Sequence, residues 1–100
     1  MIVCQFIFKP GTYDDEFYRL DAEIDEFAKA LPGFVRVEAW FSKDGTQKNA
    51  CYYFESMDDV KQLAAYPAHR EAKSKQARWY DGYQIVISEV TSTYGDGRLG

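Results

Sequence analysis

The chain has 100 residues, of which 46% are hydrophobic and 28% are charged, and its formal net charge is −4. This length suits one globular domain with a core of its own. The acidic balance argues against nucleic acids and anionic membranes as partners, because both attract clusters of Lys and Arg. No apolar run approaches the roughly 20 residues that a membrane-spanning helix needs.

The N-terminal segment and the two cysteines indicate the cellular compartment. Residues 1–8 are apolar but lack a basic start, and Lys9-Pro10 ends the run, so we interpret it as a strand rather than a signal peptide. Cys4 and Cys51 lie in strand-like runs, where we expect reduced thiols in a cytoplasmic protein. Two core cysteines and a redox pair on neighbouring strands are both compatible with this placement.

The first half of the chain predicts a strand, a helix and a β-hairpin. Residues 2–8 are dense in β-branched and aromatic side chains, which favours a strand. Thr12 is the expected N-cap of the following helix. Apolar residues then recur at helical spacing up to Pro32-Gly33. These residues are Phe17, Leu20, Ile24, Phe27 and Leu31. Asp44-Gly45 separates strands at 34–41 and 49–54, which is a strong hairpin signal.

The second half predicts a broken helix and a last strand. Ser56 is the expected N-cap of a short helix, and Pro67 interrupts it, because proline disfavours helix at the residue before it. A further helix is expected over residues 68–80. Asp81-Gly82 is then expected to turn the chain into a strand over residues 83–90.

The order β-α-β-β-α-β predicts an α+β, ferredoxin-like sandwich with a four-stranded antiparallel sheet and its helices on one face. We expect one domain over residues 1–95 and a flexible tail over residues 96–100. The first strand is apolar on both faces, so the open face of the sheet needs a cover. The simplest cover is the same face of a second copy, and we therefore expect a homodimer.

The only histidine, His69, suggests where acid–base chemistry could occur. Ala72, Gln76 and Trp79 follow it at spacings that place all four on one helical face. One interpretation is a half-solvated histidine at the rim of the helix. The other is that His69 and Gln76 face a cavity with Trp79 or Tyr80 as a wall, and that His69 is a general base.

Motifs for common cofactors and metals are absent from the sequence. There is no Gly-rich dinucleotide fingerprint, no P-loop and no Cys/His cluster with ligand spacing. We therefore expect no cofactor and no bound metal.

Several short motifs occur in an order and spacing typical of one family. They are Lys9-Pro10-Gly11, Leu31-Pro32-Gly33-Phe34, Phe54-Glu55-Ser56-Met57, Pro67-Ala68-His69-Arg70-Glu71-Ala72-Lys73, Tyr80-Asp81-Gly82-Tyr83 and Glu89-Val90 followed by Tyr94-Gly95. With them, residues 2–95 resemble the antibiotic biosynthesis monooxygenase (ABM) domain family, whose members are dimeric α/β barrels.

The resemblance implies a pocket between sheet and helices in each protomer, where some members oxidise quinol-like aromatic molecules without a cofactor. The expected catalytic residue is His69. The expected pocket residues are Cys4, Phe6, Gln76, Trp79, Tyr80 and Tyr83. Haem-degrading members would need Asn, Trp and His where this chain has Cys4, Leu63 and Lys73, which argues against haem degradation. The alternative function is a non-catalytic, ligand-binding or stress-associated dimeric barrel.

Overall fold

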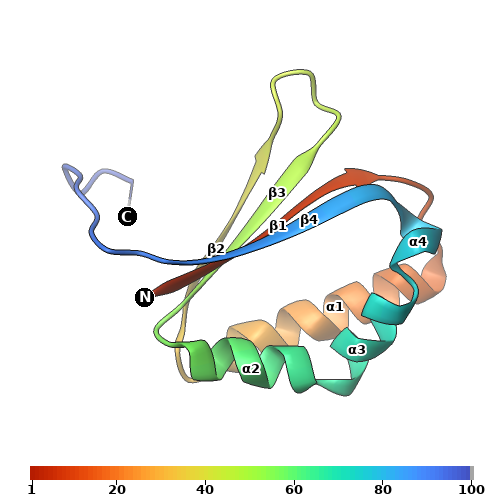
Figure 1. Cartoon of the computed structure of the whole chain (residues 1–100), viewed down its shortest axis with the longest axis horizontal. Coiled ribbons are helices and arrows are strands. Elements are labelled where there is room, and N and C mark those ends of the chain that lie inside the picture. The colour runs from red at the N-terminus through yellow and green to blue at the C-terminus, as the bar shows by residue number, and fades with distance from the viewer. Residues whose placement is uncertain (100) are drawn as a thin grey trace.

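A computed structural model describes residues 1–99 and contains four strands and four helices (Figure 1). The strands are β1 (Ile2–Pro10), β2 (Phe34–Phe41), β3 (Lys48–Phe54) and β4 (Tyr80–Glu89). The helices are α1 (Asp15–Ala30), α2 (Met57–Ala65), α3 (Pro67–Ser74) and α4 (Gln76–Trp79).

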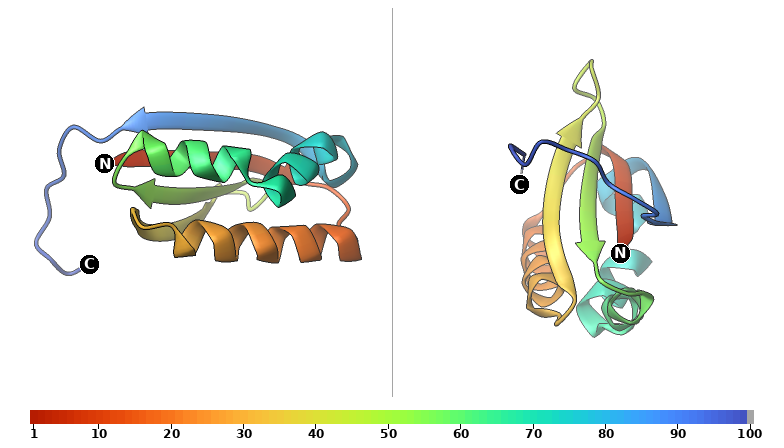
Figure 2. Two further views of the ribbon diagram at one scale, coloured as in Figure 1. Left: turned by 90° about the horizontal axis from the view of Figure 1, so that it is seen from below. Right: turned by 90° about the vertical axis from the view of Figure 1, so that its left-hand side faces the viewer.

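The strands form one antiparallel sheet in the order β2-β3-β1-β4. All helices cover the same face of this sheet, as the two views of Figure 2 show, and the other face is bare in the single chain. The expected α+β, ferredoxin-like fold with helices on one face is therefore confirmed. No helix among residues 1–99 is both long and apolar enough to cross a membrane.

The first helix begins later than the sequence suggested. Its N-cap is Asp14, whose Oδ1 accepts a hydrogen bond from the Phe17 backbone N–H at 2.9 Å, so the expectation for Thr12 was wrong. The reason is a distant contact. The Gly11 N–H donates to the Trp79 carbonyl oxygen at 2.8 Å, which holds the segment before α1 against α4.

The last helical region is split, although we expected one helix over residues 68–80. The backbone leaves helical geometry at Lys75 (φ −116°, ψ 10°), between α3 and α4. Strand β4 already begins at Tyr80, because Tyr80 and Gly82 pair with the end of β1. The expected turn at Asp81-Gly82 is therefore part of the strand.

The core consists of two clusters at opposite ends of the helical layer. One joins α1 to α3 and α4 through Phe17, Leu20, Ala68 and Trp79. The other joins α1 to β3 and α2 through Ala28, Leu31, Phe54 and Val60. Apolar burial at both ends anchors the helices to the sheet.

The two cysteines lie on opposite faces of the sheet. In the β1–β3 register Cys4 is opposite Tyr52, and Gln5 is opposite Cys51. Because neighbouring residues of a strand point to opposite faces, the thiols of one chain cannot meet. The redox pair is therefore excluded within a protomer.

The C-terminal segment leaves the sheet after Val90, whose N–H donates to the Met1 carbonyl oxygen at 2.9 Å. Residues 91–99 contain no helix or strand and run away from the domain (Figure 1). The expected tail at residues 96–100 is described as far as Leu99, and Gly100 lies outside the described residues. Its flexibility stays a prediction.

Candidate functional site

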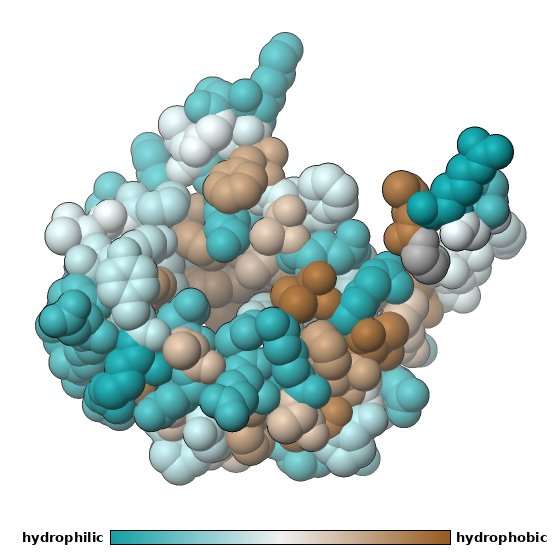
Figure 3. Space-filling view, turned by 180° about the vertical axis from the view of Figure 1, so that it is seen from behind, coloured by the Kyte–Doolittle hydropathy of each residue, from teal (hydrophilic) through white to brown (hydrophobic). Residues whose placement is uncertain are grey.

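The helices leave part of the sheet face uncovered beside the β2–β3 hairpin. Figure 3 shows a hollow there, and its floor is coloured toward the hydrophobic end of the scale. In the sheet, Ala39 of β2 pairs with Ala50 of β3, and Ala50 is opposite Phe6 of β1.

Two carboxylates of α1, one helical turn apart, lie near Tyr52 of β3. Asp25 accepts a hydrogen bond from the Tyr52 hydroxyl at 2.7 Å and pairs with Lys29 at 2.8 Å. Asp21 is exposed to solvent, yet protein atoms surround its carboxyl group, and this desolvation, reinforced by Asp25, raises its pKa.

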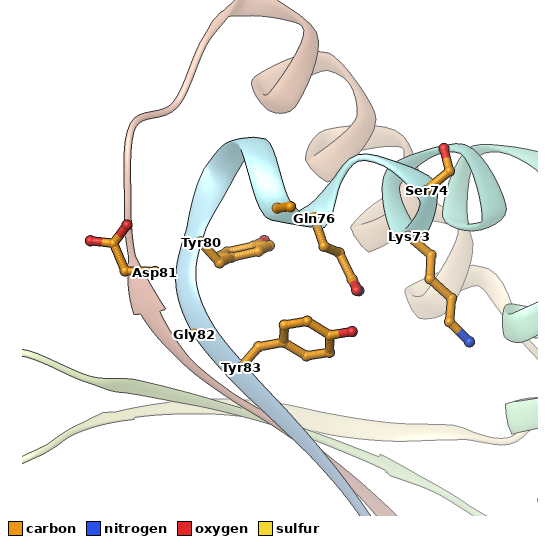
Figure 4. A pocket seen from close by; sticks show the side chains of 8 residues that line it. Lys73, Ser74, Gln76, Tyr80, Asp81, Gly82 and Tyr83 are labelled. Carbon is orange, nitrogen blue, oxygen red and sulfur yellow. The ribbon is translucent and has the colours of Figure 1, made fainter.

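A second opening, a pocket of about 350 Å³, lies where α3 and α4 meet the start of β4. Its lining residues are Lys73, Ser74, Gln76, Ala77, Tyr80, Asp81, Gly82 and Tyr83. In Figure 4 the rings of Tyr80 and Tyr83 lie one above the other, the Gln76 side chain reaches toward them from α4, and Lys73 lies farther off on α3. The Asp81 carboxylate points away from this space.

Tyr80 lies between the pocket and Phe6 of β1. It lines the pocket, and its ring packs edge-on against Phe6 at 5.2 Å between centroids. Burial raises the pKa of its hydroxyl, and the nearby groups of Tyr13 and Asp21 raise it further. Tyr80 is therefore a protonated hydrogen-bond donor at neutral pH, with Asp21 on its other side.

Three of the six expected pocket residues line this opening, and a fourth, Phe6, packs against two of them without lining it. Gln76, Tyr80 and Tyr83 line it, and the Phe6 ring lies 5.2 Å from that of Tyr80 and 6.0 Å from that of Tyr83.

The other two expected pocket residues lie elsewhere. Trp79 is 2% exposed within the core, and its Nε1 donates to Asp14 at 3.1 Å. The break at Lys75 turns Trp79 away from the face that carries Gln76. Cys4 packs against the core cluster around Phe54, toward the other end of the sheet.

The only histidine is half-buried on α3 and is not among the residues that line the pocket. Its Nδ1 is buried and has no hydrogen-bond partner among the described residues. Burial lowers the pKa of His69, and the positive charge of Lys73 lowers it further. His69 is therefore neutral at pH 7, the state that a general base requires.

Sequence reasoning missed Asp21, Asp25 and Tyr52. A usable signal was present, because Asp21 follows Phe17 by four residues and Asp25 follows Asp21 by four. Both carboxylates therefore border the apolar stripe of α1 and do not lie on its solvent face. Among the described residues, no group of three His, Cys, Asp or Glu side chains is arranged to hold a metal ion.

Comparison with known proteins identifies the fold. No family model and no curated protein matches the sequence. Among solved structures, a mutant form of SnoaB, a cofactor-independent oxygenase from Streptomyces nogalater, is 17% identical with a TM-score of 0.72, over 92% of this chain and 94% of SnoaB. A candidate ABM protein of Nitrosomonas europaea is 18% identical with a TM-score of 0.69, over 92% of this chain and all of its own. The chain has the ABM fold.

A third solved structure has a similar fold. Rv0793 from Mycobacterium tuberculosis is 13% identical with a TM-score of 0.69, and the match covers 94% of this chain and 98% of Rv0793. The ABM fold thus extends over nearly the whole chain, and both openings of the site lie within the matched architecture.

Proposed function

We propose that this protein is an ABM-type monooxygenase that oxidises a small aromatic or quinol-like substrate, without a cofactor, between its sheet and helices. The observation that carries the proposal is the incomplete filling of this layer. The pocket beside β4 is lined by Tyr80 and Tyr83, and Figure 3 shows a further hollow between the hairpin and the helical layer. Aromatic rings and titratable groups surround them, and SnoaB, which has the same fold, is a cofactor-independent oxygenase.

The chemistry needs a proton acceptor and a site that stabilises a substrate anion. A phenol that loses its proton becomes an electron-rich phenolate, which O2 oxidises more readily. A phenol ring and O2 can yield a quinone and water: one oxygen atom becomes the new carbonyl and the other leaves as water. The substrate supplies all the electrons. In this scheme the substrate extends from the pocket toward α3, where neutral His69, outside the pocket lining, accepts the proton, and the Tyr80 hydroxyl donates to the oxygen anion.

The second candidate function is a non-catalytic, ligand-binding or stress-associated dimeric barrel. The observation that favours it is the lack of a complete acid–base pair at the pocket. His69 has an unsatisfied Nδ1, so no residue orients its ring. Asp25 is already engaged by Tyr52 and Lys29.

Oxygen uptake with a panel of naphthols, anthrones and hydroquinones distinguishes the two functions. We expect turnover of at least one compound, and an about tenfold or greater loss of kcat in His69→Ala, in the range usual for a general base. Lys61→Met, on the exposed surface of α2, is the control that keeps full activity. Unchanged kcat in His69→Ala removes His69 from the mechanism. Ligand binding without oxygen uptake favours the non-catalytic barrel.

We further propose a homodimer that pairs the bare faces of two sheets and works in the cytoplasm. Val3 and Ile7 of β1 and Val86 of β4 point to this face, and an uncovered apolar sheet face favours a second layer. Sedimentation equilibrium tests the dimer. We expect a dimer at micromolar concentration that Val86→Asp dissociates, and a wild-type monomer would contradict the proposal.

A further inference from the structure

The charges around the pocket are unequal. Lys73 is the only cationic residue in its lining and Asp81 the only anionic one. Figure 4 shows the Asp81 carboxylate turned away from the space, whereas Lys73 of α3 lines it on the side opposite the start of β4. The pocket therefore presents a positive charge, although the whole chain has a net charge of −4.

Among the described residues, Lys73 has no carboxylate partner, whereas Lys75 and Arg78 do. The Lys75 ammonium is bound by Glu16 and Glu71, and the Arg78 guanidinium by Asp14 at 2.9 Å. Within residues 1–99, no carboxylate oxygen lies within 4.0 Å of the Lys73 ammonium. Lys75 and Arg78 are thus neutralised by the protein, whereas Lys73, the cationic residue of the pocket lining, keeps its charge for a ligand.

The remaining walls suit a flat ring. Tyr80 and Tyr83 present their rings to the space, and Gln76 adds an amide that can donate and accept. A volume of about 350 Å³ is at the small end of ligand pockets and accommodates two fused rings.

We propose that this pocket binds a flat aromatic compound that carries a carboxylate, with Lys73 pairing the carboxylate and Tyr80 and Tyr83 contacting the ring. Lys73 then determines the preference of the pocket for a negatively charged ligand over a neutral one. That this ligand is the substrate rests on the proposed function, whereas its binding to the pocket does not. A carboxylate held at Lys73, near the mouth, directs the ring toward Tyr80.

Two naphthalenes that differ in charge test the inference without any oxidation. The probes are 3-hydroxy-2-naphthoate, an anion at neutral pH, and 2-naphthol, which is neutral there. Calorimetry measures their Kd for the wild type and for Lys73→Met, Lys73→Arg and Lys61→Met. Met and Arg match Lys in helix propensity, so the helix is retained. Lys61 is an exposed lysine of α2, outside the pocket lining.

We expect the wild type to bind the naphthoate about tenfold more tightly than the naphthol, as one charge-assisted hydrogen bond would allow. Lys73→Met should abolish this preference and leave naphthol binding unchanged. Lys73→Arg and Lys61→Met should keep it. Equal binding of both probes by the wild type overturns the inference, as does no binding of either, or an unchanged preference in Lys73→Met. Charge-selective binding without oxygen uptake refutes only the proposed function.

Discussion

The contact between Gly33 and Asp59 joins the turn after α1 to the first turn of α2. Asp59 is 5% exposed, and its Oδ1 accepts a hydrogen bond from the Gly33 N–H at 3.1 Å. Its Oδ2 accepts one from the Ser56 hydroxyl at 3.3 Å. A Cβ atom on Gly33 would lie 2.0 Å from Asp59 Oδ2, so the carboxylate occupies the space of a side chain.

This geometry predicts strong coupling between two substitutions. Gly33→Ala displaces the carboxylate and should cost about 3 kcal/mol through overpacking and the lost hydrogen bond. Asp59→Ala leaves the buried Gly33 N–H unsatisfied and should cost about 2 kcal/mol. Without the carboxylate the clash disappears, and alanine at 33 is neutral or stabilises by about 0.5 kcal/mol by restricting the unfolded chain. The double variant should therefore lose about 2 kcal/mol instead of about 5 kcal/mol.

Urea unfolding followed by circular dichroism measures the four free energies at one fixed protein concentration, because a dimer would make stability depend on concentration. Gly82→Ala is the matched control, since a Cβ there meets nothing within 4 Å. Asp59→Asn keeps an acceptor and should be less destabilised than Asp59→Ala. Additive losses in the double variant, within about 0.5 kcal/mol, would refute the steric reasoning.

Three further predictions concern the site and its supports. Burial and the charge of Lys73 lower the pKa of His69, so the unfolded chain binds this proton more readily than the folded protein. The free energy of unfolding should therefore fall as the pH drops through about 6.5 toward the folded pKa. His69→Gln should make the urea midpoint less dependent on pH in this range, and an unchanged dependence would contradict the prediction. Diamide should form no disulfide between Cys4 and Cys51 within one chain; a monomer that has lost two hydrogens by mass spectrometry would be incompatible with their opposite faces. Gly11→Ala places a Cβ 2.7 Å from the Trp79 carbonyl oxygen and should cost about 1–3 kcal/mol in urea unfolding; a cost below about 0.5 kcal/mol would show that α4 adjusts freely.

The elements that the sequence predicted well depend on neighbours in the chain. Pro32-Gly33 ends α1, and the apolar spacing from Phe17 to Leu31 places one face of this helix against the sheet. The hairpin follows from Asp44-Gly45: Gly45 adopts φ +76°, and Asp44 Oδ1 accepts from the Thr46 N–H at 3.1 Å. Such signals act over a few residues, so they are readable without tertiary structure.

The elements that were predicted wrongly depend on a partner far along the chain. Because β1 pairs with β4, strand β4 begins at Tyr80. Because Gly11 is hydrogen-bonded to Trp79, helix α1 begins only after its N-cap Asp14. Asp14 also holds Trp79 in the core. No local pattern encodes these pairings, because their energy comes from segments that meet only on folding.

The candidate site also has a part that the sequence predicts and a part that depends on tertiary contacts. By itself the sequence determined the fold class, the family it resembles, and Gln76, Tyr80 and Tyr83 as pocket residues, because these three lie close together on consecutive elements. Only the tertiary structure decided that Asp21 and Asp25 of α1 lie near Tyr52 of β3, since helix packing brings them together. It alone also left Lys73 unpaired, because ion pairs form between side chains that folding brings within reach.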